Sequence, residues 1–178
     1  MHSVYCTKKL QSFIKEVEEK LPANLSEISL SDWNAHLFFI EKRKCIIFIN
    51  NITFYSVFLT DILKKDLKTI DIIFKERLKE QLIHDKIIET DESTESIFPG
   101  MKLKFYRTNN NKKVIGRIND FVDMFKIHCS YKYENFNEMN IIHENGLING
   151  TPTGKLLELK KSWSSPIKNV KEIIKTSA

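Results

Sequence analysis

The sequence predicts an α+β fold: a mostly antiparallel central sheet of four to six strands with helices packed against it. Two patterns carry this prediction. Residues 34–60 hold three consecutive apolar runs, which we interpret as a three-stranded meander. On both sides of this region, apolar residues recur at three- and four-residue spacing, which is typical of helices with one buried face. A chain of 178 residues can bury one substantial core, so we expect a single globular domain, 1–178.

The N-terminal part predicts a short strand followed by a helix. Residues 2–6 read as the strand, and from Thr7 the apolar spacing becomes helical. We expect Thr7 to cap this helix and Pro22 to lie just beyond its end. The predicted buried stripe of the helix is Leu10, Phe13, Ile14, Val17 and Leu21.

The meander itself is divided by two turn signals. Its first run alternates between two faces, whereas "CIIFIN" and "FYSVFL" are apolar on both. Strands without a polar face are buried on both sides, so helices or a partner subunit must cover this sheet. The charged segment "EKRK" at 41–44 predicts a hairpin tip in water. Asn50 and Asn51 predict a second tight turn, because asparagine tolerates positive φ.

A long helix and a further strand follow the meander. Apolar residues of 66–88 line one helical face, with lysines and glutamates opposite. The acidic, hydroxyl-rich segment 89–98 predicts a mobile loop. Residues 101–107, "MKLKFYR", alternate as a strand does, and "TNNNKK" after them predicts a polar turn.

The C-terminal part is predicted to be helical. Apolar residues at helical spacing indicate a helix around 118–125. Thr151 suits the N-cap and Pro152 the first turn of a helix that reaches Trp163. A last amphipathic segment spans 166–175.

The cysteines and histidines indicate packing rather than chemistry. Cys6, Cys45 and Cys129 lack the short spacing of a zinc or redox motif, and we expect them to be buried, reduced thiols. His36 and His128 are expected as core histidines bonded to the backbone. The sequence predicts no metal and no cofactor. Without a secretory signal or a membrane-length apolar run, the expected location is the cytoplasm.

Four polar residues form the alternative, catalytic interpretation of the sequence. Metal-dependent nucleases combine two acids with a lysine on adjoining strands, and Asp32 with Glu41 could supply the acids. However, the lysine position holds Arg43, which does not readily lose a proton to activate water. Asn119 and Asp120 would complete a carboxylate and amide site in one cleft. The simpler interpretation is that the last two cap a helix, as Asn and Asp often do.

A basic surface is the strongest positive signal for a ligand. From Met101 to Gly116 the chain carries cations and no acid. Along a strand, Lys102, Lys104 and Tyr106 would share the outward face, which suits phosphate contacts and base stacking. The candidate nucleic-acid-binding residues are Lys102, Lys104, Tyr106, Arg107, Lys112, Lys113, Arg117, Lys42, Arg43 and Lys44. The competing interpretation is an ordinary solvated strand face.

Four segments occur in an order that resembles a known family. They are "CTKKL", "DWNAHLFFIEKRKCIIFIN", "VIGRINDF" and "NGTPTGKL". The sequence resembles an uncharacterised bacterial family known only as a domain of unknown function, over about Cys6 to Leu156. The resemblance implies one compact domain and no activity.

Together these features predict a small cytoplasmic, non-catalytic binding module, such as an adaptor, an inhibitor or an antitoxin-like protein. Its partner would be a protein or, through the basic strand, a nucleic acid. The alternative is an enzyme acting on nucleic acid or a nucleotide. A homodimer that covers the sheet is a third alternative, and no membrane association is expected.

Overall fold

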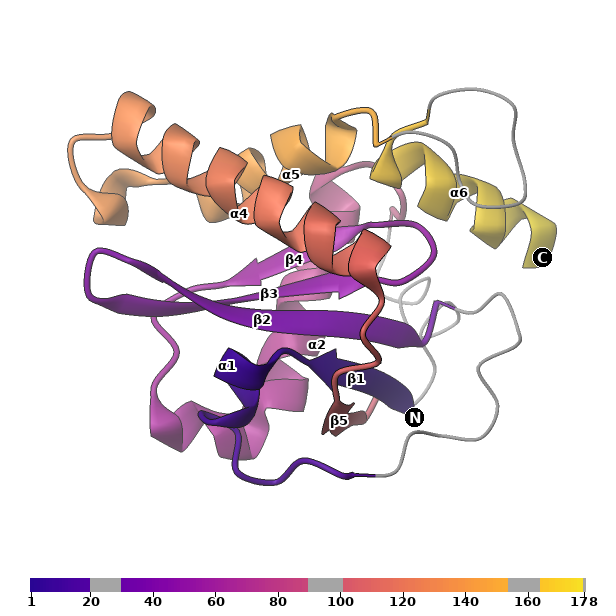
Figure 1. The fold of residues 1–178 in the computed structure, drawn as a ribbon. Coiled ribbons are helices and arrows are strands. Elements are labelled where there is room, and N and C mark those ends of the chain that lie inside the picture. The colour runs from indigo at the N-terminus through magenta and orange to yellow at the C-terminus, as the bar shows by residue number, and fades with distance from the viewer. Residues whose placement is uncertain (20–29, 90–100, 154–163, 178) are drawn as a thin grey trace.

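The computed structural model describes residues 1–19, 30–89, 101–153 and 164–177, which form a five-stranded sheet with helices on both faces (Figure 1). The strand order is β4-β3-β2-β1-β5. The strands are β1 (His2–Cys6), β2 (Asp32–Ile40), β3 (Arg43–Asn50), β4 (Ser56–Leu59) and β5 (Leu103–Arg107). The predicted α+β class and the meander at 34–60 are confirmed.

The sheet is mixed, whereas the sequence predicted a mostly antiparallel one. β2, β3 and β4 pair antiparallel, as short turns dictate, but β1 pairs parallel with both β2 and β5. Parallel neighbours require a long connection across a face of the sheet. The chain between β4 and β5 makes such a crossing with helix α2 (Ile70–His84), and β5 therefore runs in the same direction as β1.

Helices cover both faces, as strands without a polar side require. α4 (Lys112–Lys132) and α5 (Ile141–Gly150) lie on one face, and α2 lies on the other with the short α1 (Lys8–Gln11) (Figure 1). The remaining elements are α6 (Pro166–Ser177) and the 3-10 helices η1 (Lys64–Thr69) and η2 (Phe136–Glu138). None of the helices in these described segments is long and apolar enough to span a membrane.

Each face of the sheet has an aromatic core. On the α2 side, Phe74 packs edge-on against Trp33, with ring centroids 5.1 Å apart, and 4.5 Å from Phe48. On the α4 side, Phe58 and Phe125 stack with centroids 4.2 Å apart. Large aromatic rings contribute much of the buried area in such cores. Because side chains alternate along each strand, the meander is held between α2 and α4.

The first helix is shorter than predicted. α1 ends at Gln11, although Leu10 and the residues after the helix still pack into the core as the periodicity requires. The Thr7 hydroxyl lies 2.9 Å from His36 Nδ1 and makes no capping bond. Glu18 then pairs with β5, donating its N–H to Phe105 and accepting from the N–H of Arg107. The open edge of β5 therefore competes with the helix for this segment, and Leu21 and Pro22 lie outside the described residues.

Helices α4 and α5 begin at asparagine caps. Asn111 accepts a bond from the N–H of Val114 and begins α4 well before Asn119 and Asp120, so the predicted capping role of those two residues is wrong. Asn140 caps α5, a helix that the sequence analysis did not predict. Thr151 ends α5 instead of beginning a new helix. Most of the predicted helix up to Trp163, and nearly all of the predicted acidic loop 89–98, lie outside the described residues.

Candidate functional site

The charged segment 41–44 forms the tip of the β2–β3 hairpin and the first residues of β3. Ile40 pairs with Arg43, so Glu41 and Lys42 form the turn and the next two residues begin β3. Glu41 has a φ of 52°, in the left-handed region that non-glycine residues seldom adopt. Arg43 pairs with Asp61 at 3.0 Å and lies over the ring of Phe136. The predicted turn is confirmed, and the arginine fixes the hairpin tip against η2.

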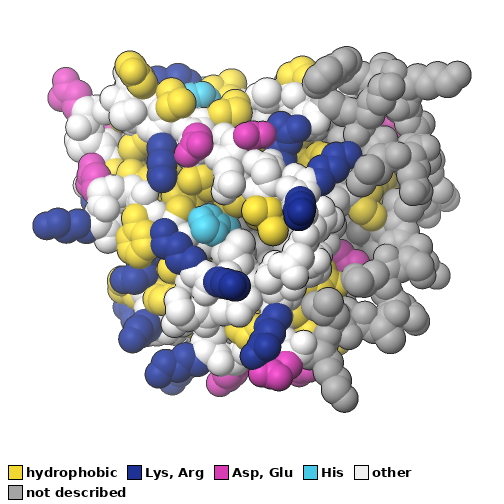
Figure 2. Space-filling view, in the orientation of Figure 1, with side chains coloured by type: hydrophobic (Ala, Val, Ile, Leu, Met, Phe, Trp, Pro, Cys, Tyr) yellow, Lys and Arg dark blue, Asp and Glu magenta, His cyan; other side chains and the backbone are white. Residues whose placement is uncertain are grey.

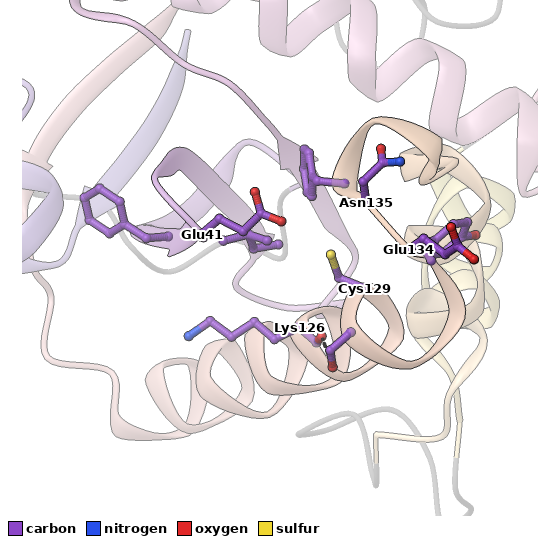
Figure 3. A pocket seen from close by; sticks show the side chains of 10 residues that line it. Glu41, Lys126, Cys129, Glu134 and Asn135 are labelled. Atoms are coloured by element: carbon purple, nitrogen blue, oxygen red, sulfur yellow. Dashed lines mark hydrogen bonds between the residues drawn. The ribbon is translucent and has the colours of Figure 1, made fainter.

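A pocket of about 510 Å³ lies beside this tip, between the hairpin, the C-terminal half of α4 and η2 (Figure 3). The lining residues are Phe39, Ile40, Glu41, Lys126, Cys129, Ser130, Tyr133, Glu134, Asn135 and Phe136. The pocket has the size range of ligand sites. It combines apolar walls with a few polar groups, which is the usual composition of a binding site.

The charges of the pocket are unevenly placed. Figure 3 shows the Lys126 side chain extending away from Glu134 and Asn135, with Glu41 on the hairpin opposite it. The Cys129 sulfur faces the interior of the pocket, but burial, and then the charge of Glu41, raise the pKa of its thiol. A thiol with a raised pKa is mostly protonated at neutral pH and is a poor nucleophile. Cys129 is therefore poorly suited to act as a nucleophile at neutral pH.

A buried carboxylate hydrogen-bonds to a residue that lines the pocket. Glu144 of α5 is 1% exposed and accepts a 2.7 Å hydrogen bond from the hydroxyl of Tyr133, a lining residue. Lys132 Nζ lies 3.0 Å, and His128 Nδ1 2.7 Å, from the same carboxylate. Burial acts to raise the pKa of Glu144, but these three partners outweigh it and hold the pKa below its ordinary value. His128 thus lies against a carboxylate, although its Nδ1 makes no hydrogen bond in the described residues, and the predicted bond to backbone is not seen there.

His36 lies on β2 near the cationic end of the pocket. Burial, and then the positive charges of Lys9 and Lys126, lower the pKa of His36 from 6.5 to about 4. The unfolded chain would bind a proton at a higher pH than the folded protein does. The contribution of this histidine to stability is therefore complete above about pH 6.5 and decreases as the pH falls towards 4.

We expect His36→Gln to reduce the acid sensitivity of the fold. Urea unfolding between pH 7 and 4 should show the wild-type free energy of unfolding falling more steeply than that of the variant, by roughly 1–3 kcal/mol over the window. Gln keeps a polar group near the Thr7 hydroxyl, so the comparison isolates the titration. If the free energy of unfolding depends on pH equally in the two proteins, the pKa of His36 is not lowered by folding.

A second polar cluster is buried and hydrogen-bonds to the backbone of the outer strand β4. Ser56 lies on the outer edge of β4, and the side-chain amide of Asn149 accepts from its N–H at 2.9 Å and donates to its carbonyl at 3.0 Å. Asn145 also donates to that carbonyl, and to Gln81. Asp85 accepts from the hydroxyl of Tyr55 at 2.7 Å. The cluster replaces the missing neighbour strand, because each buried backbone group requires a partner.

The four residues of the catalytic alternative do not converge. Asp32 and Glu41 lie at opposite ends of β2, which at about 3.3 Å per residue separates them by roughly 30 Å. Asn119 lies inside α4, and Asp120 pairs with Arg117 at 3.2 Å. The prediction that they share one cleft is wrong, because the hairpin tip and the start of the strand point to opposite ends of the sheet.

The predicted basic strand is largely neutralised. Lys104 pairs with Glu18 at 2.9 Å and Arg107 with Glu19, because the segment before residue 20 runs along β5. Tyr106 is 5% exposed, so the expectation of an outward ring for base stacking is wrong. Lys42, Lys102, Lys112 and Lys113 are exposed, and Lys44 and Arg117 are half-buried. Lys and Arg side chains are spread over the face shown in Figure 2, with hydrophobic side chains visible between them.

The cysteines behave as predicted. Cys6, Cys45 and Cys129 are free and buried, and burial raises the pKa of the first two to about 12. Across the segments that the structure describes, no group of three or more His, Cys, Asp or Glu side chains could hold a metal ion.

Comparison with known proteins identifies a family. The model of the domain of unknown function DUF6933 matches residues 3–169, which is most of the chain. Neither the curated proteins nor the solved structures give a match. The matched span includes β1 from Ser3, the whole of β2 to β5, the hairpin tip and the residues that line the pocket. The chain therefore belongs to the DUF6933 family.

Proposed function

We propose that this protein is a non-catalytic binding module that engages a protein partner through the pocket at the β2–β3 tip. The pocket itself carries the proposal: apolar walls from Ile40 and Phe136 adjoin the carboxylates of Glu41 and Glu134. Desolvated aromatic and apolar surface supplies most of the free energy of such interfaces, and charges at the rim supply selectivity.

The form of the site supports a rigid, pre-organised surface. Arg43 joins the hairpin to η2, and Tyr133 is held by the buried Glu144. A surface that is already ordered loses little conformational entropy on binding. An adaptor, an inhibitor or an antitoxin-like protein would act in this way. We also propose a cytoplasmic location, which the three buried free thiols favour because cytosolic proteins keep cysteines reduced.

Blocking the pocket is the direct test. Ser130 is an exposed residue of α4 that lines the pocket, so Ser130→Trp would fill it from the solvent side. Asn119→Trp adds the same ring at an exposed position of the same helix, away from the pocket, and is the matched control. Affinity purification from cells should recover a stoichiometric protein with wild type and with the control, and lose it with Ser130→Trp. Recovery of no partner, or equal recovery by both variants, would reject the proposal.

A nucleic-acid partner is the second candidate, and the exposed Lys102, Lys112 and Lys113 favour it. A gel-shift titration with single-stranded and double-stranded RNA and DNA at 50 mM and 200 mM salt tests it. Phosphate contacts would make binding weaken by orders of magnitude between the two salt concentrations. Lys112→Glu with Lys113→Glu should abolish such binding. The absence of any shift at low salt would reject this candidate.

A further inference from the structure

The hydrogen-bond pattern shows which backbone groups of β2 face away from β3. The N–H of Asn51 donates to the carbonyl of Asp32, so the even-numbered residues of β2 bond to β3. The odd-numbered residues face the other side, where the N–H of Thr7 donates to the carbonyl of Ala35. The outward groups of β2 are therefore those of Trp33, Ala35, Leu37 and Phe39.

The sheet protects its two outer edges at specific points. The Asn149 side chain occupies the outward N–H and carbonyl of Ser56 on β4. Glu18 pairs with the outward groups of Phe105 and Arg107 on β5. Exposed strand edges recruit other chains, and folded proteins cover them with such devices.

β2 has a third, partial edge that is left open. Its pairing with β1 ends at Ala35, while the strand continues to Ile40, and Figure 1 shows the β2–β3 hairpin extending past the end of β1. Leu37 is 4% exposed, whereas Phe39 is 39% exposed. Among the residues that the structure describes, Phe39 has no backbone partner on the side facing away from β3.

The pocket reaches this open edge. Ile40 packs into the α4-side core, and Phe39, the preceding residue of the strand, points to the opposite face, where Lys9 lies 4.8 Å from its ring centroid. Both residues nevertheless line the same pocket. Because the Phe39 side chain points to the other face, its share of the lining is assigned to the backbone. The unpaired backbone of Phe39 and the pocket thus adjoin.

We propose that a short extended segment of the partner protein adds to β2 at Phe39 and places one side chain in the pocket. This inference rests on the proposed function and names the class of its ligand. The backbone of the segment exchanges hydrogen bonds with the N–H and carbonyl of Phe39, as in other cases of strand addition. An apolar side chain fits the walls of Ile40 and Phe136. A cationic side chain two residues along the segment, on the same face as this apolar side chain, faces Glu41 and Glu134, away from the Lys126 ammonium group.

Synthetic peptides test the ligand class. The probe is a nine-residue peptide of alternating Thr and Val with a central Leu and an Arg two residues to either side of it, so that Leu and Arg share one face, and the comparison peptide carries Glu in place of Arg. In NMR titrations of the full chain, the Arg peptide should shift the Phe39 amide and slow its hydrogen exchange. The Glu peptide should bind at least roughly tenfold more weakly. Equal affinities, or no shift at Phe39 with either peptide, would overturn the inference.

Removing single backbone donors tests strand addition. N-methylation of each peptide residue in turn should weaken binding roughly tenfold at the position opposite Phe39 and little elsewhere. On the protein, Phe39→Pro removes the outward N–H and should lose the same binding, while Phe39→Val keeps it. If Phe39→Pro does not fold, the N-methylated peptides still test strand addition with the wild-type protein.

The outcomes separate this inference from the proposed function. Binding that Ser130→Trp abolishes, but that no N-methylation or Phe39→Pro weakens, would overturn strand addition while leaving pocket binding in place. A dimer of the free protein that Phe39→Pro dissociates would assign the edge to a second copy of the chain and would also overturn the inference. The proposed function fails separately, through the purification comparison.

Discussion

Replacement of Asn149 by leucine is expected to lower the free energy of unfolding by about 2–4 kcal/mol. Asn149 is completely buried, and its amide satisfies both the N–H and the carbonyl of Ser56. Leucine has a similar volume and leaves the buried Ser56 N–H without a partner, which costs about 1–3 kcal/mol, and it removes one of the two bonds to the carbonyl, which Asn145 still satisfies. Asn149 also approaches Asp85 at 3.4 Å, so the substitution weakens the cluster on that side as well.

Urea unfolding of Asn149→Leu measures the effect, and Asn119→Leu is the matched control. Asn119 is exposed on α4, where the same substitution should change the free energy of unfolding by no more than about 0.5 kcal/mol. Similar midpoints for the two variants would show that the Asn149 amide does not substitute for a neighbour strand. If the free energy of unfolding falls with urea concentration at the same slope in both variants, they expose similar surface on unfolding and their stabilities can be compared directly.

Alanine substitution at two helical glycines is expected to have opposite effects. A Cβ on Gly146 of α5 would lie 2.6 Å from His84 Cε1 and 2.8 Å from Asp85 Oδ1. The histidine ring would have to leave its 2.9 Å contact with the buried Asp85. A Cβ on Gly116 of α4 meets nothing within 4 Å. Alanine favours a helix over glycine by about 1 kcal/mol, and at Gly116 this gain is unopposed.

We therefore expect Gly116→Ala to raise the melting temperature by roughly 2–4 °C and Gly146→Ala to lower it by a similar or larger amount. Differential scanning calorimetry of the two variants provides the measurement. His84→Ala combined with Gly146→Ala is the control, because removing the ring relieves the closest contact. If Gly146→Ala is stabilising by itself, α5 does not pack as closely on α2 as the distances indicate.

The sequence was sufficient for the fold class because period and polarity are local signals. The three apolar runs of 34–60 and the helical stripe that includes Phe74 are confirmed. The parallel pairing of β1 was not predictable in this way, because it depends on a contact with β5 about a hundred residues later. The first helix was overpredicted for the same reason: its periodicity continues past Gln11, but Glu18 gains partners on β5.

The pocket was recognisable only in part. The turn at Glu41 was predicted, but the lining residues Ser130, Tyr133 and Asn135 fall in a stretch that reads as an irregular polar and aromatic link. Their importance comes from packing against the hairpin tip, which the sequence does not encode locally. α5 was missed because its buried face is polar, with Glu144 and two asparagines. A signal was nevertheless present in Asn140, which suits an N-cap before that segment.

The place of β1 in the strand order has a consequence for how the chain reaches its native state. The meander joins neighbours in sequence and can collapse early, but β1 lies between β2 and a strand that emerges from the ribosome only after residue 107. Such distant contacts raise the contact order and slow folding to the millisecond-to-second range. Until residues 103–107 have been synthesised, one side of β1 has no strand to pair with, and we expect completion of the sheet to be a late step of folding during synthesis.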